Sequence, residues 1–337
     1  MKSLYEFSFG SNRRSLKLGQ ILSGLLAVTI VMGWSCLVYA DAAHRFTFNI
    51  KKGETLDILD NNKIVGRFML AYDVSTPERK HETYKPYLHV FDAKGIAPIT
   101  KGAGGEYTHH RGIFIGWNRI GCNGKTYDRW HMKGGEQVVQ GTPVTDISAD
   151  TATVTATVNW NDEASQPLLV EKRTMTFHRA PEPAYALIDF QADITATAGD
   201  ITLNGDPEHA GIQFRPANEM DRAKTTYLYA GEAVNPHAAK DLAWIGETFT
   251  LKDTCYSVVQ MNHPDNPSET RISAYRNYGR FGMFPTVSIN SGDTRAFRYR
   301  FLVTEGVMPP LEVIQKACNA FTGRSDPVPP VTSKAAE

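Results

Sequence analysis

The chain has few cysteines and no excess of either charge. Its 337 residues include four cysteines, and Lys plus Arg equals Asp plus Glu at 36 each. A neutral chain gives no general signal for nucleic acid, whose phosphates select basic surfaces. Beyond residue 40 only Cys122, Cys255 and Cys318 remain, so at most one disulfide can form, and their spacing fits no zinc motif. We expect these cysteines to be buried apolar residues.

The common nucleotide and hydrolase motifs are missing as well. The chain has no Walker A loop, no G-x-G-x-x-G, no H-E-x-x-H, no C-x-x-C and no G-x-S-x-G. These absences remove the usual sequence support for nucleotide binding, dinucleotide binding and the common hydrolase mechanisms. Any chemistry must therefore be argued from the polar clusters that are present.

The one long uncharged run lies at the N-terminus. Four basic residues precede the uncharged segment 21–40, and Val38-Tyr39-Ala40 places small residues where a signal peptidase reads. We expect residues 1–40 to be a signal peptide cleaved near Ala40. The product would be periplasmic or secreted, without stable membrane insertion. A retained anchor is the alternative, because 20 uncharged residues are long enough to span a bilayer.

Short alternating segments dominate the remainder. Apolar and polar residues alternate in 151–160, 186–191 and 297–303, which predicts β-strands with one apolar face. Helical periodicity is nearly absent except at 310–321, where a proline precedes and a glycine follows the apolar positions. We predict an all-β fold, a large antiparallel β-sandwich with one short C-terminal helix, as a single domain over residues 41–323. We predict that the polar segment 324–337 is a disordered tail.

The first polar cluster is His109-His110-Arg111, directly before the apolar run that ends at Trp117. On a regular strand the two histidines point to opposite faces, so a metal bound by both would need a bulge or loop. Adjacent histidines also occur as one buried structural residue beside one free residue. Both interpretations stay open from the sequence.

The second cluster is the segment Asp206–Arg215. As a strand it places His209, Gly211, Gln213 and Arg215 on the face opposite its apolar residues. We interpret that face as the floor of a groove for a polar ligand, in which the glycine lets a ligand approach the backbone. A solvated outer face is the alternative.

A third, looser cluster runs from the loop 262–267 to Tyr278, and Trp130-His131 and Tyr87-Leu-His89 add aromatic–histidine pairs. The loop is rich in Asn, Asp and Pro, which favour turns, and loops on rigid sheets often carry sites. Aromatic faces beside planar hydrogen-bonding groups suit sugar rings. The clusters together therefore indicate a carbohydrate ligand, a small molecule or an oligosaccharide.

These blocks resemble the DUF6807 family, on Tyr87-x-His89, the segment 109–117, Asp206-x-x-His209-x-Gly-x-Gln-x-Arg215 and the segment 262–267. The resemblance covers most of residues 45–305. It implies an exported protein with a galactose-mutarotase-like supersandwich, from a family frequent in bacteria that degrade polysaccharides. The label methane oxygenase, which such chains also carry, does not fit. A particulate methane monooxygenase subunit spans the membrane several times, whereas this chain has one hydrophobic run.

The resemblance implies imidazole and carboxylate acid–base chemistry on a sugar or glycoside, by hydrolysis, elimination or epimerisation. The expected catalytic residues are His110, His209, Asp206, Glu208 and Glu136. The expected substrate-binding residues are His109, Arg111, Trp117, Trp130, His131, Gln213, Arg215, His263, Arg276, Tyr278 and His89. No metal ligand is assigned, because no ligand spacing is diagnostic, although a divalent metal held by histidines stays open.

Two other functions stay open at this stage. A non-catalytic carbohydrate-binding protein would use the same groove without turnover, and convergence of a histidine with a carboxylate in one pocket distinguishes it from an enzyme. A structural module of the envelope would instead show an exposed apolar patch and no polar groove.

Overall fold

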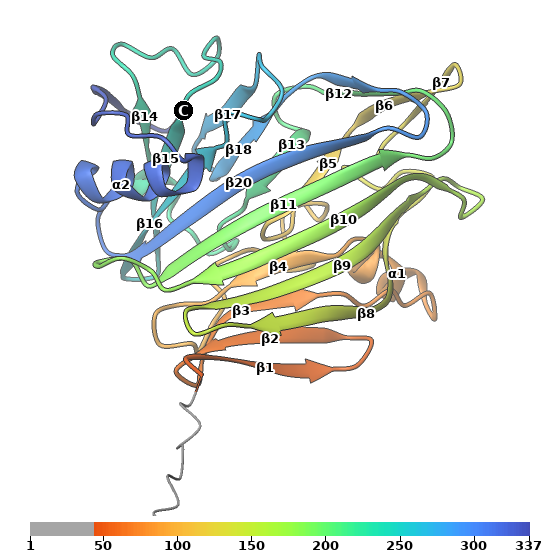
Figure 1. Cartoon of the computed structure of the whole chain (residues 1–337), viewed down its shortest axis with the longest axis horizontal. Helices are drawn as coiled ribbons and strands as arrows, with labels where there is room; N and C mark the ends of the chain where they lie inside the picture. Colours follow the sequence, from red (N-terminus) through yellow and green to blue (C-terminus); the bar gives the residue numbers. More distant parts are fainter. Residues whose placement is uncertain (1–43) are drawn as a thin grey trace, which may run out of the picture. The chain divides into compact units, whose positions relative to one another are not determined.

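Antiparallel strands make up most of the chain in the computed structural model, which describes residues 44–337 (Figure 1). Strands account for 51% and helices for 7%. The predicted signal peptide lies outside the described residues. Within residues 44–337, no helix is long and apolar enough to cross a membrane.

A nine-stranded antiparallel sheet forms one layer of the fold (Figure 1). Its long strands include the alternating segments 151–160, 186–191 and 297–303, and most of their apolar residues point to the inner side of the sheet. In spatial order the strands are β21 (Val331–Ala335), β14 (Thr226–Ala230), β15 (Trp244–Leu251), β16 (Thr254–Asn262), β20 (Thr294–Glu305), β11 (Ala186–Ala196), β10 (Pro167–His178), β9 (Thr151–Asn161) and β8 (Gln137–Ile147).

Three four-stranded sheets pack against the inner face of the large sheet. The first is β1 (Phe46–Lys51), β2 (Thr55–Asp60), β3 (Lys63–Met69) and β4 (Tyr87–Val90). The second is β17 (Arg271–Arg276), β18 (Arg280–Phe284), β13 (Ala210–Phe214) and β5 (Phe114–Trp117). The third is β19 (Val287–Ile289), β12 (Ile201–Asn204), β6 (Arg119–Cys122) and β7 (Lys125–Tyr127). A bridge between Leu88 and Ile113 joins the first two of these sheets.

The main core lies between the large sheet and the three smaller ones. Along β9 the predicted apolar residues are buried and alternate with half-exposed threonines. They pack in one cluster with residues of β2, β4, β5, β13 and β18. Burial of this apolar surface is the main stabilising contribution, at roughly 25 cal/mol per Å².

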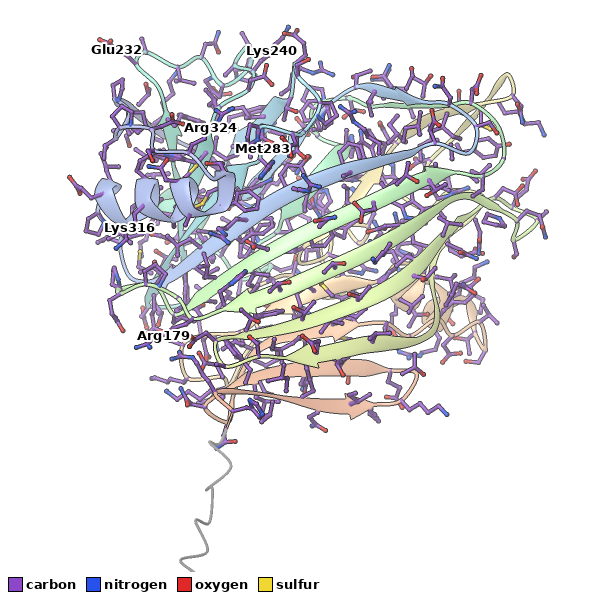
Figure 2. The ribbon with its side chains drawn as sticks, in the orientation of Figure 1. Arg179, Glu232, Lys240, Met283, Lys316 and Arg324 are labelled. Carbon is purple, nitrogen blue, oxygen red and sulfur yellow. The ribbon has the colours of Figure 1, made fainter. Side chains whose placement is uncertain are left out.

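A second core lies on the outer face of the large sheet, under helix α2 (Leu311–Thr322). Leu302 of β20, which alternation alone would place in solvent, packs there with Trp244 and Ile314. The opposite side of α2 is exposed at Lys316 (Figure 2). Pro310 precedes the helix, and Gly323 ends it in the left-handed conformation. The predicted C-terminal helix is therefore confirmed.

The structure differs from the predicted tail and adds elements that the sequence did not predict. Within the segment 324–337, residues Val331–Ala335 form β21 and pair with β14. A second helix, α1 (Pro77–Thr83), begins at the Thr76 cap, and a 3-10 turn, η1, covers Arg222–Lys224. The cysteines at 122, 255 and 318 are free, and the first and last of them are buried. The described residues belong to one compact unit.

Candidate functional site

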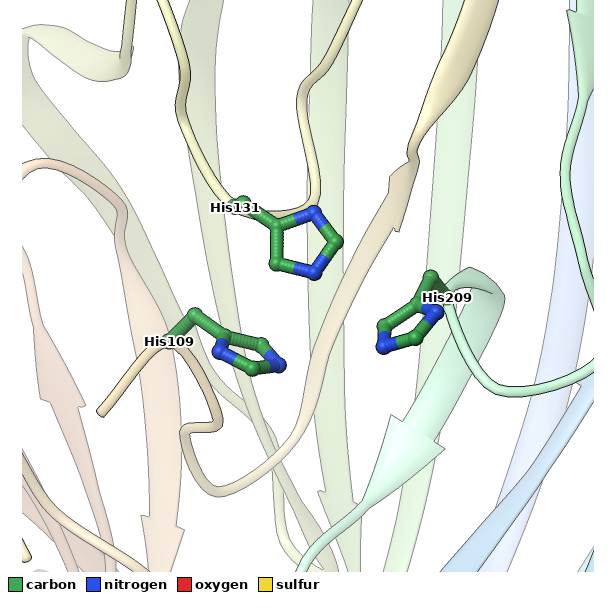
Figure 3. Close-up of side chains that lie close together, drawn as sticks. All are labelled: His109, His131 and His209. Carbon is green, nitrogen blue, oxygen red and sulfur yellow. The ribbon is translucent and has the colours of Figure 1, made fainter. Parts of the chain in front are cut away.

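Three histidines from separate loops lie together in the structure (Figure 3). His109 precedes β5, His131 lies between β7 and β8, and His209 immediately precedes β13. One ring nitrogen of each lies within 4.8 Å of the others. The ring centroids are 4.4 Å apart for His109 and His131 and 4.6 Å apart for His131 and His209. We call these residues the three-histidine cluster.

Two of these imidazoles are oriented by the same local device, an aspartate three residues earlier. Nδ1 of His131 lies 2.7 Å from Asp128 Oδ2, and Nδ1 of His209 lies 2.6 Å from Asp206 Oδ1. Each aspartate also accepts backbone N–H groups of its own loop, from His131 at 2.8 Å and from Glu208 at 3.1 Å. Because the carboxylate holds the Nδ1 proton, Nε2 of each ring is left with a free lone pair.

Burial and neighbouring charge favour the neutral form of His109 and His209. Burial lowers the pKa of His109 well below its ordinary value, and the charges of His131 and Lys85 lower it further. Burial also lowers the pKa of His209, although Asp206 partly offsets this effect. The Nε2 atom of His109 is buried and has no hydrogen-bond partner. Neutral imidazoles with free lone pairs are the form that binds a metal ion.

A turn decides which of the two adjacent histidines joins the cluster. Tyr107 has a φ of 50°, and its carbonyl accepts the backbone N–H of His110 at 2.8 Å, so this segment is not extended. His109 reaches the cluster. His110 is 2% exposed, keeps both ring nitrogens without a partner, and packs beside Tyr107 and Tyr278. The strand β5 begins only at Phe114.

Of the three predicted catalytic carboxylates, only Asp206 contacts the cluster. Burial would raise the pKa of Asp206, but His209 and Asn118 lower it overall. Glu208 accepts hydrogen bonds from Arg276 and from the Tyr278 hydroxyl, which is 2.8 Å away. These bonds outweigh burial and lower the pKa of Glu208. Glu136 instead lies 3.8 Å from Lys80 and 3.4 Å from Asn161, so its contacts do not fit the predicted catalytic role.

Several residues predicted to bind substrate are instead buried and contact other parts of the protein. Trp117 is fully buried, packs on Trp160 and Phe297, and donates its indole N–H to the Pro285 carbonyl. Gln213 is fully buried and donates to the Arg111 carbonyl at 3.0 Å. These two side chains belong to the core, contrary to the predicted contact with substrate. Trp130 is also fully buried and stacks edge-on against His209 and His110.

Two predicted histidines have their contacts elsewhere. His89 hydrogen-bonds Thr100 at 2.9 Å, and burial lowers its pKa to about 4. His263 packs edge-on against Phe321 of α2 and lines a cavity beside that helix. Neither residue contacts the three-histidine cluster.

The predicted groove floor on β13 is also corrected. Gly211 has a φ of +74°, and a side chain there would lie 2.1 Å from the Met283 carbonyl of β18, a residue labelled in Figure 2. The glycine therefore accommodates a neighbouring strand. All five residues of β13 are buried.

Buried cations, most of which the sequence did not single out, hold the loops of the cluster. Lys85 donates to the carbonyls of His109 and Trp130, and Arg280 donates to those of Glu208 and Ala210 at 3.1 Å. Arg129 donates to the carbonyls of Asp128, Lys133 and Gly134. Arg111, predicted to anchor substrate, is fully buried and donates to the carbonyls of His81, Thr108 and His110. Because their acceptors are main-chain atoms, no residue motif reveals these contacts.

The cluster has the composition of a metal centre. Zinc in catalytic sites is bound by three protein ligands, and a carboxylate that holds the far nitrogen of a histidine ligand is a recurrent support. Tetrahedral zinc requires about 3.3 Å between ligand nitrogens, so a bound ion would draw the three rings closer together. Asp128 and Asp206 supply the supporting carboxylates.

Comparisons with known proteins give one family and distant structural similarity. Residues 56–318 match DUF6807, described as a family of unknown function. No curated protein matches the chain. The chain is similar to the heparan sulfate lyase HepC of Pedobacter heparinus, with a TM-score of 0.40 and 11% identity over 79% of this chain. It is also similar to the α-galactosidase AgaA of Geobacillus stearothermophilus, with a TM-score of 0.36 and 10% identity over 82% of this chain. The chain spans 37% and 41% of the lengths of these two proteins.

Proposed function

Since the chain belongs to the DUF6807 family, whose function is unknown, we propose from its own geometry that it is an exported, metal-dependent enzyme acting on a carbohydrate. The observation that carries the proposal is the convergence of His109, His131 and His209, two of them oriented by carboxylates. Three imidazoles directed at one region gain nothing from one another. An electrophile between them, such as a divalent cation, explains the arrangement.

The three histidines would hold such a cation, which would supply Lewis acidity toward water or substrate. This revises the predicted acid–base roles. The Nδ1 atom of His209 is hydrogen-bonded to Asp206, so its Nε2 would hold the ion instead of exchanging a proton with substrate. Asp206 supports a ligand in this scheme and is not itself the base.

The carbohydrate part of the proposal is supported by the side chains beside the cluster. Tyr107 is 36% exposed, and its ring centroid lies 4.9 Å from that of Tyr278. Next to them Glu208 and Arg276 offer an ionised acceptor and a planar donor. Aromatic faces beside hydrogen-bonding groups suit polyhydroxylated rings.

The decisive measurement is metal binding by the purified protein. We expect one Zn²⁺ per chain in a calorimetric titration, and a higher melting temperature with Zn²⁺ that EDTA reverses. The variants His131→Ala and His209→Ala should lower Zn²⁺ affinity by on the order of 100-fold or more, since a lost ligand costs more than a lost supporting carboxylate. The matched control is His237→Ala, which removes an exposed histidine. Binding that is absent, or that survives both substitutions, would exclude the metal centre.

Turnover is tested on the same preparations. A panel of glycosides and sugar acids should be converted by the Zn²⁺-loaded protein and not by His209→Ala. Binding without conversion across the panel would instead indicate the non-catalytic carbohydrate-binding protein.

Export is tested at the N-terminus of the mature chain. We expect the protein isolated outside the cytoplasm to begin near Asp41, because residues 1–40 have the layout of a signal peptide. Intact-mass spectrometry checks this directly. A membrane-bound chain that retains residues 21–40 would show an anchor in place of a cleaved signal.

A further inference from the structure

One polar segment predicted from the sequence has no place at the three-histidine cluster. The loop 262–267 follows β16 and lies beside helix α2, where His263 packs against Phe321. Arg215, also predicted to bind substrate, is 4% exposed beside the buried Glu247 and the Tyr278 ring, so it belongs to the interior. The loop is instead at the surface, and its polar side chains need a separate explanation.

Hydrogen bonds fix the conformation of the loop 262–267. The Asn266 amide group donates to Asn262 Oδ1 and to the Arg298 carbonyl, both at 2.7 Å, and accepts the Arg298 backbone N–H at 2.7 Å. Asp265 forms an ion pair with Arg298, also at 2.7 Å. Because the loop is already ordered, a ligand that binds to it loses little free energy in ordering the protein.

The loop forms one wall of a cavity of ≈ 260 Å³, and the end of α2 and the segment 241–243 form other walls. Part of the lining is apolar, at Leu242, Ala243 and Cys318. Arg324, which Figure 2 shows beside α2, lies on the polar part. The volume is just below the roughly 300–1,000 Å³ of typical small-molecule sites, so the cavity can hold one compact molecule.

The loop supplies hydrogen-bond donors to this cavity. Nδ1 of His263 accepts the backbone N–H of Asp265 at 3.2 Å, so Nε2 carries the ring proton and can donate it to a ligand. Burial lowers the pKa of His263, which favours this neutral form. Oδ1 of Asn262 is bonded to Asn266, which leaves Nδ2 of Asn262 to donate.

The other walls supply acceptors, and the charges of the cavity are mixed. The Asp241 carboxylate is oriented by the backbone N–H groups of the segment 269–270, at 3.0 and 2.9 Å. Thr322 donates its hydroxyl proton to a carbonyl of α2, so its oxygen can accept from a ligand. Arg324 and Asp326 lie 4.0 Å apart at the rim. With both signs present, the lining does not select a strongly charged ligand.

We propose that this cavity is a second carbohydrate site, which binds one neutral sugar residue. Each hydroxyl of a sugar both donates and accepts, as the polar part of the lining requires, and the apolar part suits the C–H face of the ring. The cavity shares no residue with the three-histidine cluster. The inference therefore goes beyond the proposed function, and binding here does not depend on a metal ion.

The test is calorimetric titration of the full chain, with and without EDTA, using methyl glucoside, methyl galactoside and methyl xyloside. We expect at least one glycoside to bind equally well in both conditions. Ala243→Trp should abolish this binding, because the indole fills the cavity and no polar group is removed. His263→Ala should weaken it by roughly 3- to 10-fold, the loss of one neutral hydrogen bond. The matched controls are Ala164→Trp and His237→Ala, both at exposed positions.

Failure of the second site and failure of the proposed function give different results. Glycoside binding that EDTA abolishes and Ala243→Trp leaves unchanged would place the sugar at the three-histidine cluster and overturn the second site. Absence of glycoside binding in both conditions would overturn it as well. Ala243→Trp should keep the melting temperature of the original chain, since Ala243 is exposed. Loss of Zn²⁺ binding in the unaltered protein would overturn the metal centre and leave the second site intact.

Discussion

At the scale of single residues, the arrangement that distinguishes this protein is the repeated Asp-x-x-His loop. Asp128 and Asp206 each hold the Nδ1 atom of the histidine three positions later and tie down backbone N–H groups of the same loop. The aspartate therefore fixes both the conformation of the loop and the tautomer of the ring. Such supporting partners typically change metal affinity by about 10- to 100-fold.

We predict that Asp128→Asn and Asp206→Asn each lower Zn²⁺ affinity by about 10- to 100-fold, because an amide is a weaker and less polarising acceptor than a carboxylate. Calorimetry at fixed pH measures this. Asp146→Asn, at an exposed position, is the control. Unchanged affinity in both loop variants would mean that the aspartates support the loops alone and do not tune the histidines.

Part of this site could be predicted from the sequence, and part could not. All three clustered histidines are among the residues predicted from sequence, and the spacing Asp128-x-x-His131 repeats Asp206-x-x-His209, so the repeat was a usable signal. Strand periodicity could not select His109 over His110, because the turn at Tyr107 decides it. Lys85 and Arg280 could not be predicted, since they donate to main-chain carbonyls of residues distant in sequence, and Arg129 could not because its acceptors are carbonyls of its own loop, which no residue type marks.

At the scale of elements, helix α2 is attached to the large sheet by a half-buried ion pair as well as by apolar contacts. Asp189 of β11 accepts two hydrogen bonds from Arg300 of β20, at 2.5 and 2.8 Å. The same guanidinium donates to the Ala317 carbonyl of α2 at 3.1 Å and stacks on Phe321. One side chain thus joins two strands and the helix.

We predict that Asp189→Asn destabilises the protein by about 1–3 kcal/mol near neutral pH, because it leaves Arg300 with a weaker partner. Burial would raise the pKa of Asp189, but bonds from Arg300 and His178 lower it overall. The unfolded chain therefore takes up this proton at a higher pH than the folded chain does. The stabilisation is complete above about pH 5 and is lost as the pH falls.

Urea unfolding of both proteins across this pH range tests the prediction. The difference in unfolding free energy between the original chain and Asp189→Asn should shrink toward low pH. A difference that stays constant with pH would show that the aspartate contributes packing and not charge.

Strand and helix elements were predictable where one periodicity dominated. The segment 151–160 is β9 with the predicted residues inside. The strand β13 alternates in sequence as well, but it is buried on both faces, so the polar surface that its alternation predicted does not exist. Helix α1 had a local signal, a threonine cap followed by proline, in a segment too short for periodicity.

At the scale of the whole molecule, the main discrepancy lies in the segment 324–337. Its residues are polar and rich in proline, and such composition is typical of disorder. In the structure β21 pairs with β14 and completes the nine-stranded sheet. The segment forms a strand because β14 would otherwise be an edge strand with unpaired backbone groups. The composition of the segment alone gives no sign of this neighbour.

The contacts of Lys85, Arg111 and Arg280 with backbone carbonyls have a consequence for which substitutions these loops tolerate. Every residue has a backbone carbonyl whatever its side chain. These hydrogen bonds therefore place no demand on the residue types at Thr108, Trp130 or Ala210. The position of the histidines therefore depends on the backbone path of these loops, and the residue type matters there only through packing, as at the buried Trp130 and Ala210.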